Sequence, residues 1–82
     1  MKLTRPTVFS TLTCAFCKQV EYLLEKKGIK YDKIMLDNDL ETRNELHKIT
    51  GATTVPITYI GGKFYVGWTP KLIQAINSYE GE

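Results

Sequence analysis

The sequence predicts one α/β domain in which helices cover both faces of a mixed four-stranded sheet. Three observations support this fold class. The chain has 82 residues, enough for one core. Its strand-like and helix-like segments follow the order βαβ, helix, ββ, helix. The last two strand-like runs are separated by Gly61 and Gly62, which is typical of a tight hairpin.

The first three elements are expected to form a right-handed βαβ unit. Residues 7–10 are a short β-prone run after Pro6. From residue 15 to 27, apolar side chains recur at three- and four-residue spacing, and Gly28 stands where a left-handed residue would end a helix. Residues 31–36 read as a second strand that is half exposed at its start. The apolar positions of the helix are Cys17, Val20, Leu23 and Leu24.

The second helix is expected to be the least buried. The acidic cluster of residues 37–39 offers an N-cap, and Gly51 offers an end. Between them the apolar stripe is thin, consisting of Leu40, Leu46 and Ile49. The helix therefore has few side chains with which to cover a sheet.

The chain is predicted to end in a β-hairpin and a third helix. Residues 57–60 and 63–66 are the two hairpin strands. Thr69 is a favourable N-cap, and Pro70 suits the first helical position. The buried face of this helix is expected to comprise Leu72, Ile73, Ile76 and Tyr79.

Composition indicates an ordinary globular protein, with 43% hydrophobic and 24% charged residues. The net charge of +2 comes from 11 basic and 9 acidic residues that are interspersed, which argues against nucleic acid as a partner. The N-terminus has no export signal, and no 18-residue apolar run occurs. We therefore expect a single cytoplasmic domain over residues 1–82, with no membrane partner.

The two cysteines, Cys14 and Cys17, are too close together to act as a structural staple. They could be a reactive dithiol, half of a metal site or incidental core thiols. Their place after a strand and at a helix start favours the dithiol, because unpaired N–H groups and the helix dipole stabilise a Cys14 thiolate. Cys17 lies on the apolar face and should keep its proton longer. Cys14 is thus the predicted nucleophile, and Cys17 the resolving thiol.

A metal site is the alternative reading of this motif. Zinc needs four ligands, and the one further obvious candidate is His47, on a different predicted helix. The prediction is therefore no metal and no bound cofactor in the monomer. A zinc or iron-sulfur centre that uses Cys14 across a dimer stays open, and a brown colour would favour the cluster.

The motifs, taken in order along nearly the whole chain, resemble those of a glutaredoxin. They are Val8-Phe9-Ser10, Cys14-Ala15-Phe16-Cys17, Gly51-Ala52-Thr53-Thr54-Val55-Pro56, Gly61-Gly62, and Gly67 before a capped helix. The resemblance implies a thioredoxin-like fold of the glutaredoxin type and a cis bond before Pro56. It also implies that the Val55 backbone is offered to a substrate. The candidate substrate-binding residues are Thr11, Thr13, Phe16, Thr54, Val55, Pro56, Gly67, Trp68 and Thr69.

Two departures from that pattern concern glutathione. Glutaredoxins usually carry a basic residue three places before the first cysteine, and here that residue is Thr11. They also commonly carry Asp residues before the last helix, where this chain has Pro70-Lys71. Residues 65–70 are instead similar to NrdH-type redoxins, which take electrons from thioredoxin reductase and supply a ribonucleotide reductase. Trp68 would then be either a partner contact or a packing residue.

The predicted function is a thiol-disulfide oxidoreductase that works as a monomeric dithiol electron carrier. Its expected partners are a disulfide-containing protein, with ribonucleotide reductase as one candidate, and thioredoxin reductase or glutathione as the reductant. The Ala15-Phe16 dipeptide departs from both redoxin groups, so the reduction potential stays undecided. Phe16 would present an apolar surface beside Cys14.

Overall fold

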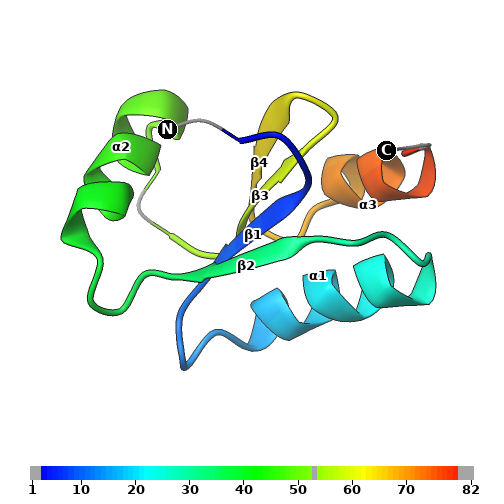
Figure 1. The fold of residues 1–82 in the computed structure, drawn as a ribbon, viewed down its shortest axis with the longest axis horizontal. Helices are drawn as coiled ribbons and strands as arrows, with labels where there is room; N and C mark the ends of the chain where they lie inside the picture. The colour runs from blue at the N-terminus through cyan, green and yellow to red at the C-terminus, as the bar shows by residue number, and fades with distance from the viewer. Residues whose placement is uncertain (1–2, 53, 80–82) are drawn as a thin grey trace.

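The computed structural model describes residues 3–52 and 54–79, and it has the predicted order of elements (Figure 1). The elements are β1 Thr7–Ser10, α1 Ala15–Lys26, β2 Asp32–Met35, α2 Leu40–Thr50, β3 Ile57–Ile60, β4 Lys63–Val66 and α3 Pro70–Asn77. The βαβ-α-ββ-α prediction is confirmed. None of the helices within these residues is long and apolar enough to cross a membrane.

The four strands form one mixed sheet in the order β2-β1-β3-β4. Strand β1 runs parallel to β2 and antiparallel to β3, and β3 and β4 make the antiparallel hairpin. Strands β2 and β4 are therefore the two edges. The predicted exposure at the start of β2 is confirmed, because Asp32 and Lys33 are exposed. Met35 at the end of this edge strand is exposed as well, and Ile34 is half-buried.

Helices lie on both faces of the sheet, as expected (Figure 1). Two apolar clusters fill the space beneath them. Successive side chains of a strand point to opposite faces, so Val8 belongs to one cluster and Phe9 to the other. The α1–α3 cluster consists of Val8, Val20, Leu24, Ile60, Leu72 and Ile76. The α2 cluster consists of Phe9, Leu36, Leu46 and Ile57.

Helix α2 is the least buried helix, as predicted. Leu46 is its buried residue, whereas Leu40 and Ile49 are 69% and 50% exposed. The N-cap is Asp39, whose carboxylate accepts hydrogen bonds from the backbone N–H of Thr42 at 3.1 Å and from its hydroxyl at 2.7 Å. These two bonds lower the pKa of Asp39. Gly51 ends the helix with φ 76°, a left-handed conformation that glycine adopts easily.

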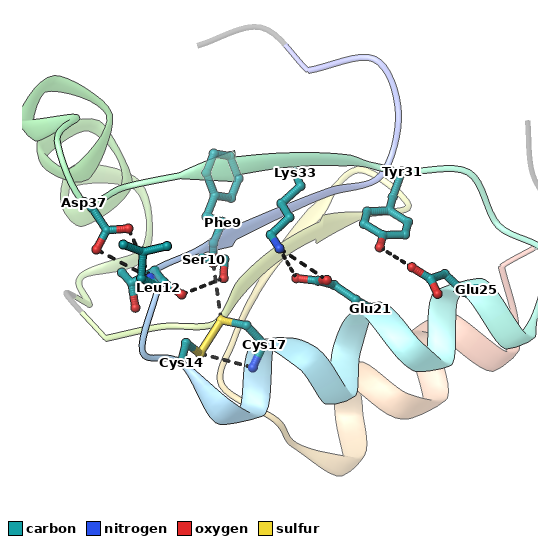
Figure 2. Close-up of polar contacts among 11 residues, drawn as sticks. Phe9, Ser10, Leu12, Cys14, Cys17, Glu21, Glu25, Tyr31, Lys33 and Asp37 are labelled. Carbon is teal, nitrogen blue, oxygen red and sulfur yellow. Dashed lines mark hydrogen bonds and ion pairs between the residues drawn. A yellow bond between two sulfur atoms is a disulfide. The ribbon is translucent and has the colours of Figure 1, made fainter.

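A polar edge joins α1 to the segment that enters β2 (Figure 2). Tyr31 donates its hydroxyl to Glu25 at 2.7 Å, and Lys33 Nζ lies 3.2 Å from Glu21 Oε2. Burial, followed by the hydrogen bond to Glu25, raises the pKa of Tyr31 well above its usual value. These contacts fix the C-terminal half of α1 against the sheet, while its first turn is left for the cysteine motif.

Candidate active site

Cys14 is the N-cap residue of α1. Its backbone is extended, with φ −87° and ψ 106°, so the chain turns into the helix at this residue. The Cys14 sulfur accepts a hydrogen bond from the backbone N–H of Cys17 at 3.1 Å (Figure 2). That N–H is among those at a helix start that lack a partner inside the helix. A thiolate at this position is stabilised by the bond and by the positive end of the helix dipole.

The two sulfurs are joined in a disulfide but have different surroundings. Cys14 is half-buried, whereas Cys17 is 1% exposed and lies on the buried side of α1. The Cys17 sulfur lies 4.0 Å from the carbonyl oxygen of Phe9. After reduction, the Cys17 thiol can donate to this carbonyl, which favours its protonated form. The environments thus match one accessible nucleophile and one shielded thiol.

Three loops reach the same end of the sheet. Phe9 pairs with Ile57 in the β1–β3 ladder, so the residues just beyond them, which lead to Cys14 and back to Pro56, lie at one end. The backbone N–H of Gly67 donates to the Pro56 carbonyl at 2.8 Å, which brings in the loop before α3. The bond between Val55 and Pro56 is cis, as the resemblance implied.

The predicted substrate-binding residues all lie on these loops or on the first turn of α1. Phe16 is 58% exposed, and Thr13 and Thr54 are exposed as well. Pro56 is buried, while Thr11, Val55, Gly67, Trp68 and Thr69 are half-buried. Their contacts with a substrate stay predictions.

Two of these residues, Trp68 and Thr69, also contribute to packing and to helix capping. Trp68 packs against the α1–α3 cluster, which supports the packing reading of this residue. Thr69 Oγ1 accepts from the Leu72 N–H at 3.4 Å, so Thr69 caps α3 as predicted.

Sequence reasoning missed two residues beside the site, Asp37 and Leu12. The Asp37 carboxylate accepts a hydrogen bond from the Leu12 backbone N–H, with Oδ2 at 3.1 Å (Figure 2). Leu12 itself is 78% exposed. In the sequence, Asp37 belongs to the acidic cluster of residues 37–39 that offers an N-cap for the second helix. The signal that could have found it is its position directly after a strand that runs parallel to the strand before the cysteines.

Cys14 is reached from outside through a shallow hollow of about 330 Å³. The hollow is lined by Leu12, Thr13, Cys14, Ala15, Lys18 and Gln19. Lys18 is exposed here, so its charge is largely solvated and contributes little to the stability of a thiolate. Cys14 borders this hollow, whereas the buried Cys17 does not.

Within residues 3–52 and 54–79, no three side chains of His, Cys, Asp or Glu gather as a metal site. His47, the predicted third ligand candidate, lies on α2, which packs on the sheet face opposite to α1. The structure therefore does not assemble a zinc site from these residues. Nothing in the site supports the alternative of an iron-sulfur centre shared by two chains.

The fold and the paired cysteines define a thioredoxin-fold protein with a dithiol site. A family model described as Glutaredoxin matches residues 7–65, and the chain belongs to the glutaredoxin family. It is 37% identical to a Pseudomonas aeruginosa glutaredoxin over 54 residues, 66% of this chain and 64% of that protein. It is 30% identical to Escherichia coli glutaredoxin 3 over 60 residues, 73% of this chain and 72% of the relative.

The chain spans less than two thirds of the length of some curated relatives that it matches. One of them is the Haemophilus influenzae hybrid peroxiredoxin hyPrx5, which is 36% identical over 61 residues. This match covers 74% of the present chain and 25% of the relative. Family membership and the Cys14–Cys17 disulfide support a thiol-disulfide oxidoreductase site.

Solved structures of the same fold include two at 20% sequence identity. The Archaeoglobus fulgidus glutaredoxin has a TM-score of 0.78 and matches 93% of this chain and 88% of its own. The Escherichia coli glutaredoxin-like NrdH-redoxin has a TM-score of 0.76 and matches 96% of this chain and 100% of its own. A buckwheat glutaredoxin–glutathione complex is 35% identical, with a TM-score of 0.66, and matches 73% of this chain and 57% of its own.

Proposed function

We propose that this protein is a dithiol electron carrier that reduces disulfides in other molecules. The observation that carries the proposal is the asymmetry of the two sulfurs: Cys14 caps a helix and accepts from a backbone N–H, while Cys17 is buried beneath it. Family membership supports the same reaction class. The electrons come from the two thiols of the protein, and no bound cofactor is required.

The reaction proceeds in two exchanges. The Cys14 thiolate attacks one sulfur of a target disulfide; that S–S bond breaks, and the leaving sulfur takes up a proton as a thiol. The Cys17 thiol then loses its proton and attacks the Cys14 sulfur of the mixed disulfide. The second target sulfur leaves as a thiol, and the Cys14–Cys17 disulfide remains. Two electrons have passed from the protein to its target, and an external reductant restores the dithiol.

Single-cysteine variants test these roles. We expect Cys14→Ser to lose disulfide reduction, and Cys17→Ser to accumulate a mixed disulfide that mass spectrometry detects. Cys14 of the reduced protein should be alkylated faster than Cys17 at mildly acidic pH. Faster labelling of Cys17, or full turnover by Cys14→Ser, would reverse or remove the assignment.

We also propose that thioredoxin reductase reduces this protein more efficiently than glutathione does. Thr11 offers no cation for a glutathione carboxylate, and Lys71 stands where an acid would hold the γ-glutamyl ammonium. Arg43, a further cation of the chain, has its Nε engaged by the Leu36 carbonyl at 2.8 Å. Two lost charge-assisted hydrogen bonds, each worth about 1.5 to 3 kcal/mol, weaken binding by about a hundredfold to ten-thousandfold.

Among the structural neighbours, the NrdH-redoxin has a thioredoxin-like activity profile, and the buckwheat glutaredoxin was seen with glutathione. A coupled assay of NADPH oxidation separates these two readings for this chain. One arm supplies thioredoxin reductase, and the other supplies millimolar glutathione with glutathione reductase, at equal protein concentration. Equal or faster turnover in the glutathione arm would contradict the proposal.

The remaining expectations belong to the same proposal. The target is a disulfide-bearing protein, with ribonucleotide reductase as the candidate that the NrdH-like segment of residues 65–70 suggests. The protein acts as a monomer in the cytoplasm. Reduction of an oxidised ribonucleotide reductase by the purified dithiol protein would test the target, and sedimentation of the reduced protein would test the monomer.

A further inference from the structure

Asp37, in the turn that follows β2, reaches the loop before Cys14. Its carboxylate accepts from the Leu12 N–H at 3.1 Å through Oδ2 and 3.5 Å through Oδ1, although the two residues are 25 positions apart (Figure 2). The preceding residue, Leu36, donates its N–H to the Ser10 carbonyl at 2.8 Å. This bond continues the β1–β2 pairing one step past the strands and places Asp37 beside the loop.

The loop itself is a tight turn that leads directly to Cys14. The Cys14 N–H donates to the Thr11 carbonyl at 3.3 Å, so Leu12 and Thr13 are the central residues of the turn. A central N–H has no partner within such a turn, and Asp37 provides one for Leu12. At the other end of the turn, the Cys14 sulfur accepts from the Cys17 N–H at 3.1 Å. Asp37 is thus bonded to one central residue of the turn, and this turn leads directly into the residue whose sulfur accepts from Cys17.

We propose that Asp37 is a positioning residue for the redox site. By fixing the turn, it keeps the Cys14 sulfur over the Cys17 N–H, where the thiolate is stabilised. This role rests on the proposed function of Cys14 as the nucleophile. The contribution is geometric, because a negative charge near a thiolate disfavours the thiolate. Asp37 is not required for α2 either, since Asp39 is the N-cap of that helix.

Four substitutions separate the hydrogen bond from the charge and the side chain. Asp37→Asn keeps an acceptor oxygen and removes the charge, whereas Asp37→Ala removes both. Leu12→Pro deletes the N–H donor at a turn position where proline is favoured, and Leu12→Ala is its matched control because it keeps the donor. Asn38→Ala, at an exposed neighbouring position, is the control for the segment.

The readout is the pKa of the Cys14 thiol, from the pH dependence of its alkylation by iodoacetamide in a Cys17→Ser background. No disulfide substrate is involved, so this result is independent of whether the protein proves to be a reductase. We expect Asp37→Ala and Leu12→Pro to raise the pKa of Cys14 and, at a pH below that pKa, to slow alkylation about threefold to tenfold. Combining them should add little to either alone, because both remove the same bond.

The controls decide between geometry and charge. Asp37→Asn, Leu12→Ala and Asn38→Ala should each keep the Cys14 pKa close to that of the parent, since each leaves the bond in place. Leu12 also lines the hollow beside Cys14, so its control is read from the pKa and not from the absolute rate. A lowered or unchanged Cys14 pKa in Asp37→Ala would overturn the proposal, and so would an Asp37→Asn variant as impaired as Asp37→Ala. Thermal unfolding of each variant identifies any that fails to fold, and Leu12→Pro then tests the same bond from its donor side.

Discussion

The two faces of the sheet are covered unequally. The α1–α3 cluster has six buried residues contributed by two helices and two strands, whereas α2 contributes Leu46 alone to the cluster on the opposite face. The redox motif begins α1, so it belongs to the densely packed side. The difference indicates that this packing holds the helix on which the Cys14 chemistry depends. The sheet face beneath α2 is covered by fewer buried side chains.

The largest expected effect is the loss of a side chain from the α1–α3 cluster. Leu24→Ala should lower the free energy of unfolding by about 3 to 5 kcal/mol, because Leu24 is fully buried among five other buried residues and its cavity cannot collapse easily. Urea unfolding with unchanged slope would measure this loss. A cost below about 1.5 kcal/mol would mean that the cluster is looser than its burial indicates.

The matching deletion on the other face should cost less. Leu46→Ala is expected to lower the free energy of unfolding by about 2 to 3 kcal/mol, because the α2 cluster is smaller and its half-buried neighbours can move toward the gap. The same urea experiment gives the comparison. Leu40→Ser, at an exposed position of the same helix, is the control and should change stability by less than about 0.5 kcal/mol. A larger loss of unfolding free energy in Leu46→Ala than in Leu24→Ala would contradict the idea that the α1–α3 cluster is the more tightly packed of the two.

A smaller effect links the packed face to the chemistry. Cys17 and Leu24 lie on the same buried side of α1, so Leu24→Ala should increase local opening around Cys17. In a Cys14→Ser background, alkylation of Cys17 is expected to accelerate about fivefold with Leu24→Ala and to stay near the parent rate with Leu46→Ala. Rates measured by mass spectrometry under native conditions provide the test. Equal acceleration by both variants would mean that the faces open together.

The smallest expected effect is the response of α2 to acid. The pKa of Asp39 is lowered in the folded protein by its bonds to Thr42, so its contribution to stability is present above the ordinary aspartate pKa and is lost as the pH falls through the lowered value. Carbon chemical shifts of residues 40–43 should therefore move toward coil values below about pH 4. In an Asp39→Ala variant, the first turn of α2 should be frayed, and its carbon shifts should lie near coil values at every pH. The carbon shifts of the first turn of α1 serve as the internal comparison. If they change at the same pH as those of α2, the transition is global unfolding and not a local response of α2.

The elements that sequence predicts best are those bounded by conformationally restricted residues. The β3–β4 hairpin has the expected ends because Gly61 and Gly62 occupy the left-handed region, with φ of 62° and 82°. The proposed roles of the two cysteines rest on strand-turn-helix order and helical periodicity, which also predict the burial of Cys17 that the structure shows. Each of these signals lies within one short stretch of the sequence, so it can be read without knowing the tertiary structure.

The features that the sequence alone does not predict depend on how distant segments pair or pack in the fold. The bond from Leu12 to Asp37 joins residues 25 positions apart and exists only because β1 and β2 pair in parallel with a particular alignment. The exposure of β2 has the same origin, since a strand read alone does not reveal that it is an edge. Trp68 was undecided for a related reason, because its packing requires the loop before α3 to fold back on the core.

The two edge strands bear on how this molecule meets other chains. An open edge carries unpaired backbone groups that invite another strand to add to the sheet. Here Asp32 and Lys33 stand on β2, and Lys63 begins β4, so each edge carries charge where an added strand would lie. Charged edges oppose aggregation between sheets. In the proposed mechanism, partners attach covalently at one end of the sheet, and the charged edges discourage a further contact along its sides.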